Sequence, residues 1–128
     1  MRVRPVDDVQ IRLAAMWVAL MLTYLLGDVL RIFSGDFVPG EIGGIKATPA
    51  IWLAAAVIML VPIAMVVLSV TLGGSPLRWA TMAAAVGLFG FNLIGLPGYP
   101  GAYDRFLIVV GLLINVLTFW TAWTWETA

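Results

Sequence analysis

The sequence predicts an all-α membrane protein, with four transmembrane helices in an antiparallel up-down-up-down bundle. Of its 128 residues, 62% are hydrophobic and only 11% are charged, against roughly 45–50% and 25% in soluble domains. A helix rises ~1.5 Å per residue, so it needs about 20 mainly apolar residues to cross ~30 Å of hydrocarbon. Four apolar stretches of the sequence meet this length. We therefore expect the lipid bilayer to be the solvent of this chain.

We expect one domain over residues 1–128, with helices at about 11–33, 49–72, 77–96 and 102–125. Asp7 and Asp8 suit a helix N-terminus, Thr48 is a cap for the second helix, and Gly73 and Gly74 end it. The connections are short, so successive helices should lie adjacent and antiparallel. The apolar stretches lack the alternation that β-barrel strands require.

The basic residues predict both termini on the cytoplasmic side. With the N-terminus inside, four basic residues fall on that side and three on the other: Arg2, Arg4, Arg12 and Arg78 against Arg31, Lys46 and Arg105. The margin is one charge. The first apolar stretch follows basic residues as in a secretory signal, but no small-residue cleavage site follows it, so we expect a retained helix.

Composition removes several classes of function. Seven basic and seven acidic residues cancel, which leaves no positive excess to attract nucleic acid. Cysteine and histidine are both absent, and with them go disulfides, most zinc sites and the common haem ligands, so we expect no cofactor and no metal. A conventional hydrolase would need a histidine base. Catalysis is disfavoured on these grounds, although the sequence leaves it open.

Asp28 is the most informative residue, because an acidic side chain within a spanning segment is costly and marks a functional site by default. Two interpretations remain open. Asp28 can pair with Arg31, three residues later on the same helix face, near the lipid headgroups. Alternatively it points into the bundle beside Tyr24 and binds a proton or a cationic solute.

Asn92 and Asn115 are polar side chains deep within the third and fourth apolar stretches. They can join Tyr24 and Asp28 in one polar cluster. The alternative is that each amide forms a hydrogen bond between helices as a packing contact. Whether these residues converge on one cavity distinguishes the two interpretations.

Two further features shape the fourth and second helices. Asp104 and Arg105 stand at the start of the fourth helix, where we interpret them as an interfacial ion pair rather than a gate. Pro62 lies in the middle of the second helix and removes one backbone hydrogen bond, which predicts a kink. A kink of this kind serves as a hinge or, more commonly, only shapes packing.

Several short motifs carry a resemblance that spans almost the whole chain: residues 11–17, 24–28, 62–65, 68–69, 78–79 and 122–125. With these motifs the chain resembles a family of small bacterial membrane proteins classed as a domain of unknown function. The resemblance implies a four-helix protein of the bacterial inner membrane. It supplies no activity.

Three functions fit the sequence. The first is a non-catalytic protein, either a homo-oligomeric bundle or an accessory subunit of a larger membrane complex, because few polar groups face any interior. The second is a small proton-coupled or cation transporter that uses Asp28 as its protonatable site. The third is an intramembrane enzyme acting on a lipid or quinone, which would need Arg31 or Arg105 as the second ionisable group.

Overall fold

The computed structural model describes residues 5–42, 45–98 and 101–125. Within them lie α1 (Asp8–Ser34), β1 (Glu41–Ile42), β2 (Ile45–Lys46), α2 (Pro49–Thr71), α3 (Gly74–Gly95), the 3-10 turn Leu96–Gly98 and α4 (Ala102–Trp123). These four helices are each long and apolar enough to cross a membrane. The prediction of an all-α protein with four such helices is confirmed. Arg2 and Arg4, used in the charge argument, lie outside the described residues.

Local signals explain where the helices begin and end. The helix α1 is capped at its end by Gly35, whose φ of 83° lies in the left-handed region, and the N–H of Asp36 bonds back to the carbonyl of Arg31, as in a Schellman motif. The helix α2 is capped at its start by Thr48, whose side chain accepts from the N–H of Ile51 at 3.3 Å.

The helix α3 starts at Gly74, three residues before the predicted start at 77. Pro76 falls in its first turn, where a missing N–H costs nothing because that N–H has no partner within the helix. The φ of 69° at Gly74 is accessible to glycine, and it lets the chain turn sharply out of α2. The glycines that we expected only to end α2 therefore also begin α3.

A short β-hairpin stands where the sequence predicts only a connection between the first two helices. Glu41 lies opposite Lys46, and Ile42 lies opposite Ile45, in an antiparallel pair. Opposite charges facing each other across two strands stabilise such a pair modestly. Strands of two residues are too short to show the alternation by which a strand is recognised in a sequence.

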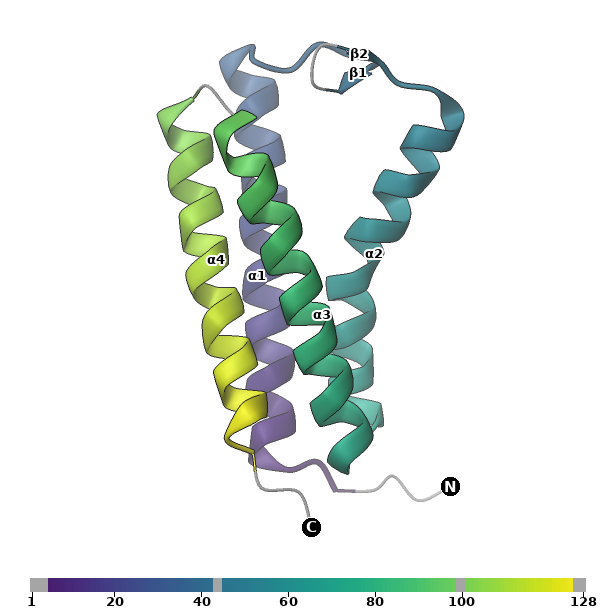
Figure 1. Ribbon diagram of the computed structural model, residues 1–128, viewed down its shortest axis with the longest axis vertical. Helices are drawn as coiled ribbons and strands as arrows, with labels where there is room; N and C mark the ends of the chain where they lie inside the picture. The colour runs from purple at the N-terminus through teal and green to yellow at the C-terminus, as the bar shows by residue number, and fades with distance from the viewer. Residues whose placement is uncertain (1–4, 43–44, 99–100, 126–128) are drawn as a thin grey trace.

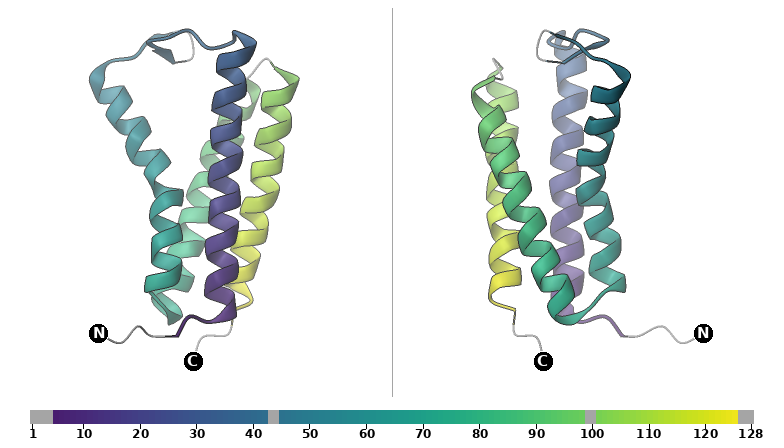
Figure 2. Two further views of the ribbon diagram at one scale, coloured as in Figure 1. Left: turned by 180° about the vertical axis from the view of Figure 1, so that it is seen from behind. Right: turned by 45° about the vertical axis from the view of Figure 1, so that its right-hand side comes forward.

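Figures 1 and 2 show successive helices running in alternating directions, with α1 between α2 and α4, and α3 packed on α4. We call the end that holds the start of α1 and the finish of α4 the termini end, and the opposite end, with β1 and β2, the hairpin end. Contacts between α2 and α3 are few. Figure 1 shows α2 changing direction near its middle and diverging from α3 toward the hairpin end; Pro62, which is buried, lies near the middle of this helix.

The bundle packs through seams in which buried residues recur at alternating spacings of three and four. On α1 the buried residues are Gln10, Leu13, Trp17, Leu20 and Gly27, and on α4 they are Asp104, Gly111, Asn115, Thr118 and Ala122. This spacing is that of helices wound in a left-handed bundle. The seam of α4 is small and polar, which makes room for the bulky seam of α1.

At the termini end, side chains tie the helices together through backbone carbonyls. The amide nitrogen of Gln10 donates to the carbonyls of Ser69 and Leu72, both at 3.1 Å. The guanidinium of Arg78 donates to the carbonyls of Ala122 and Trp123, both at 3.0 Å. These contacts hold α1 to α2 and α3 to α4, and they bond to carbonyls in the last turns of α2 and α4, where helical partners run out.

Candidate functional site

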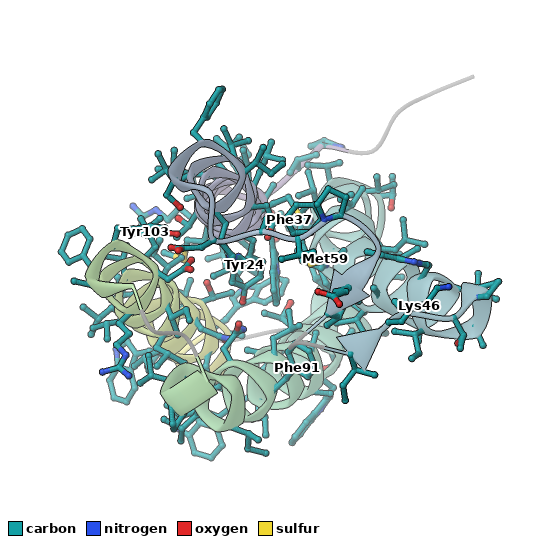
Figure 3. All side chains as sticks on the ribbon, turned by 90° about the horizontal axis from the view of Figure 1, so that it is seen from above. Tyr24, Phe37, Lys46, Met59, Phe91 and Tyr103 are labelled. Atoms are coloured by element: carbon teal, nitrogen blue, oxygen red, sulfur yellow. The ribbon has the colours of Figure 1, made fainter. Side chains whose placement is uncertain are left out.

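A pocket of about 100 Å³ lies among all four helices, in the half of the bundle nearer the hairpin end. Its apolar walls come from Ile58, Met59, Leu88, Phe91, Leu107 and Ile108. Its polar lining comes from Thr23, Tyr24, Asp28, Arg31, Asn92 and Asp104. Figure 3, viewed from the hairpin end, shows Tyr24, Met59 and Phe91 around the space between the helices. A pocket of this size holds a few water molecules or one small solute.

Arg31 bridges two carboxylates at the wall of the pocket. Its Nη2 lies 2.9 Å from Asp28 on the same helix, and its Nε lies 3.2 Å from Asp104 on α4. The Asp104 side chain is 3% exposed, whereas that of Asp28 is 51% exposed. Burying a carboxylate is tolerated when a cation is bonded to it. The guanidinium of Arg31 therefore bonds to one buried carboxylate, Asp104, and to one solvent-accessible carboxylate, Asp28.

Gly27 allows this cluster to form. It is buried between α1 and α4, and a Cβ at this position would lie 3.8 Å from both Asp104 Oδ1 and Arg31 Nη2. The ion pair thus packs directly over the α1 backbone. A side chain longer than a methyl group at Gly27 would take the space that the two charged groups occupy.

On the α3 side of the pocket, Asn92 links α1 to α3. Its amide nitrogen donates to the Tyr24 hydroxyl at 2.7 Å and to the Leu88 carbonyl of its own helix at 2.9 Å. Tyr24, Asp28 and Arg31 follow one another along α1 at spacings of four and three, so they share one helix face. One face of α1 therefore supplies most of the polar lining.

The structure brings together three of the four residues expected to form the polar cluster. Tyr24, Asp28 and Asn92 line the pocket, and Asn115 does not. The side chain of Asp28 pairs with Arg31, as the first interpretation expects, and it also lines the pocket beside Tyr24. Asn115 is 1% exposed and lies one turn beyond Gly111, toward the termini end.

Asp104 takes a different role from the one expected. We interpreted it as the partner of Arg105 at the membrane interface, and its salt bridge is instead with Arg31 in the interior. Neighbouring residues on a helix point in directions about 100° apart, so Asp104 and Arg105 do not face each other. The partner of Asp104 is instead on α1, the helix against which the buried face of α4 packs.

Sequence reasoning missed five buried polar residues among those described: Gln10, Trp17, Ser69, Thr81 and Thr118. Trp17 precedes Tyr24 by seven residues, and Thr81 precedes Asn92 by eleven, which places each on the helix face of its pocket residue. These spacings of seven and eleven residues could have been recognised in the sequence. Grouping the polar residues of each helix by the face they share would have identified Trp17 and Thr81.

Comparison with known proteins gives a family. The model of a family of unknown function (DUF6326) matches residues 4–127. No curated protein and no solved structure matches the chain. Any activity must therefore be argued from the pocket itself.

Proposed function

Because the chain belongs to the family of unknown function DUF6326, its own geometry must supply the argument, and we propose that it binds a small organic cation in exchange for a proton. It would do so as a multi-pass protein of the bacterial inner membrane with both termini in the cytoplasm. The observation that carries the proposal is the bridge of one guanidinium between Asp28 and Asp104 at the wall of a pocket. This is the small transporter among the functions that fit the sequence.

The charges of the cluster do not balance when both carboxylates are ionised. Arginine stays protonated in proteins, so one positive charge faces two negative charges. An excess charge within a low-dielectric bundle is costly, and either a proton or a second cation removes it. Asp28 is the accessible carboxylate, with 51% of its side chain exposed. A cation arriving at Asp28 would neutralise this excess charge.

The lining favours an alkylammonium ion over a strongly hydrated metal ion. The walls contributed by Ile58, Met59 and Leu88 suit alkyl groups, and the rings of Tyr24 and Phe91 stand beside them. Aromatic faces attract quaternary ammonium ions, which are weakly hydrated. The pocket therefore matches a small amine whose charge reaches Asp28 and whose alkyl groups meet the walls.

The difference between the two ends of the bundle would determine from which side a cation reaches the pocket. Gln10 and Arg78 tie the helices at the termini end, whereas α2 and α3 have few contacts and diverge toward the hairpin end. With the termini in the cytoplasm, the cation would enter from the outer side. Transport would then require a second arrangement of the helices that exposes the pocket to the cytoplasm.

The binding experiment uses the purified protein in detergent, with tetramethylammonium as the probe and a pH-indicator dye in weak buffer. We expect saturable binding with release of up to one proton per chain. Asp28→Asn should abolish the proton release and weaken binding at least about tenfold, since a charge-assisted contact contributes about 1.5–3 kcal/mol. Asp8→Asn is the matched control, because Asp8 is exposed in the first turn of α1, far from the pocket. Absence of saturable binding, or equal binding by Asp28→Asn, contradicts the proposal.

A second candidate, the accessory or homo-oligomeric subunit, is favoured by the exposure of α2. Only 11% of its most apolar stretch is buried, compared with 28% for α1 and α4. A helix that its own chain covers so little is suited to packing against a second copy or a larger membrane protein. Mass measurement after gentle extraction from native membranes tests this role, which predicts a companion in fixed stoichiometry. A monomer without a companion excludes it.

A further inference from the structure

Four buried polar atoms from three helices have no hydrogen-bond partner among the described residues: Trp17 Nε1, Thr81 Oγ1, and Nδ2 and Oδ1 of Asn115. Trp17 and Thr81 are 0% exposed and Asn115 is 1% exposed. Leaving a buried donor or acceptor without a partner costs about 1–3 kcal/mol, and roughly nine in ten such groups find one. Four such atoms in one small bundle therefore call for partners other than the described protein groups.

The three residues lie in successive layers between the pocket and the termini end. A Cβ on Gly111 would lie 3.4 Å from the Tyr24 ring, so Asn115, one turn further along α4, lies about 5.4 Å below the level of that ring. Trp17 lies two turns below Tyr24 on the face of α1 that meets α4, and Thr81 lies three turns below Asn92 on the matching face of α3. The seams of three helices thus bring these polar atoms toward the same interior.

The hydrogen-bonding capacity of the three side chains suits water. The indole only donates, the amide both donates and accepts, and the hydroxyl does either. A water molecule donates two hydrogen bonds and accepts others, and buried waters typically make about three. Thr118, the neighbouring hydroxyl on α4, already donates to the Ile114 carbonyl at 2.8 Å, so it does not complete the set.

We infer that ordered water is bound between α1, α3 and α4 in the layers of Trp17, Thr81 and Asn115. This internal water extends the polar pocket toward Gln10, the buried amide near the termini end. A hydrated path of this kind gives the proton displaced from Asp28 a route through the bundle. The route for protons rests on the proposed function, whereas the water site does not.

The experiment is radiolytic hydroxyl labelling of the detergent-solubilised protein in ¹⁸O-water, read by mass spectrometry. Radicals formed from bound water oxidise the side chains beside that water, even when bulk solvent does not reach them. We expect Trp17 to take up ¹⁸O although it is 0% exposed. Met65 is the internal control, since it is reactive, 4% exposed and located on α2, which contributes none of the unpartnered polar atoms. Labelling of Trp17 no greater than that of Met65 overturns the inference.

Variants locate the water. Asn115→Leu, which removes the amide at similar volume, should lower the labelling of Trp17 at least about threefold, and Thr81→Val should lower it less. Thr71→Val is the control, because that exposed hydroxyl bonds within its own helix, to the Val67 carbonyl at 2.8 Å. Unchanged labelling in both Asn115→Leu and Thr81→Val contradicts the site. Asp28→Asn should keep the labelling of Trp17, so a failure of cation binding and a failure of the water site are distinguishable.

Discussion

The two ends of the bundle are held together by different chemistry. At the termini end, the side chains of Gln10 and Arg78 bond to backbone carbonyls of neighbouring helices. At the hairpin end, side chains bond to other side chains: Arg31 to two carboxylates and Asn92 to Tyr24. Backbone carbonyls cannot be titrated or moved apart from their helix, whereas ionised side chains can exchange partners.

Because of this difference, we expect the termini end to act as a fixed scaffold and the hairpin end to be the part that can rearrange. Arg78 and Gln10 fix helix ends whatever the state of the pocket. At the hairpin end the described side chains tie α1 to α4, through the Arg31–Asp104 pair and the Tyr103 hydroxyl, which donates to Asp36, and tie α1 to α3 through Asn92. Figure 3 shows Tyr103 on the α4 side of the bundle, away from Met59 of α2. The α2 side of the pocket therefore has the most freedom to move.

The largest effect should come from removing the shared cation of the pocket. Arg31→Met leaves Asp104, whose side chain is 3% exposed, buried without its salt-bridge partner. Breaking a buried pair from one side costs about 3 kcal/mol or more, so the free energy of unfolding should fall by about that amount. Unfolding in mixed micelles with rising SDS, followed by circular dichroism, measures it.

The double variant Arg31→Met with Asp104→Leu should recover most of this loss, because it removes the buried charge along with its partner. Arg12→Met is the control, since Arg12 is exposed near the termini end. A double variant as unstable as Arg31→Met alone would show that the loss comes from packing rather than from the stranded carboxylate.

A somewhat smaller loss is expected at the scaffold end. Arg78→Met removes two hydrogen bonds from a guanidinium to helix-end carbonyls and its contact with the Trp79 ring, 5.3 Å away. The unfolding free energy should fall by about 2 kcal/mol, since bonds to a charged group contribute more than neutral ones. Tetramethylammonium affinity should stay within about twofold of the original protein. A large loss of affinity would show that the two ends are coupled.

The helices were predictable because apolar stretches long enough to cross a membrane can be recognised from the sequence alone. Their ends were less so: the third helix was predicted to start at 77, whereas α3 begins at Gly74 and has Pro76 in its first turn. The face shared by Tyr24, Asp28 and Arg31 was also predictable, since it depends only on spacing within one helix. The Arg31–Asp104 pair was not, because it depends on the register between α1 and α4.

That register is set by the small residues of the seams. Gly27 and Gly111 let α1 and α4 approach where Asp104 and Tyr24 need room, and no spacing within one helix reports this. The depth of Asn115 has the same origin, since the register places it one turn past the pocket. The sequence was thus enough to predict the helices and the residues that share a helix face. The contacts between helices could be identified only from the structure.

A third prediction concerns the Asn92–Tyr24 bond, which has neutral partners and should contribute less. Tyr24→Phe and Asn92→Leu should each lower the unfolding free energy by about 1 kcal/mol, with a coupling of about 0.6 kcal/mol, the average for hydrogen bonds between membrane helices. A double-mutant cycle in SDS-containing micelles measures the coupling. Zero coupling would mean that each side chain is stabilised by other neighbours and that α3 is not held to α1 through this bond.

Pro62→Ala should give the smallest change in stability, and it probes most directly the α2 side of the pocket, where contacts with α3 are few. Alanine restores the N–H that can bond to the Ile58 carbonyl, and this gain offsets the loss of the buried ring, so the unfolding free energy should change by less than about 1 kcal/mol. A straighter α2 would move Ile58 and Met59 relative to the pocket, and tetramethylammonium affinity should change about threefold or more. Pro49→Ala is the matched control, because Pro49 occupies the first position of α2, where no N–H is needed. Calorimetric titration of both variants decides the matter: an unchanged affinity in Pro62→Ala would mean that the direction of α2 does not set the shape of the pocket, and that the hairpin end is as fixed as the termini end.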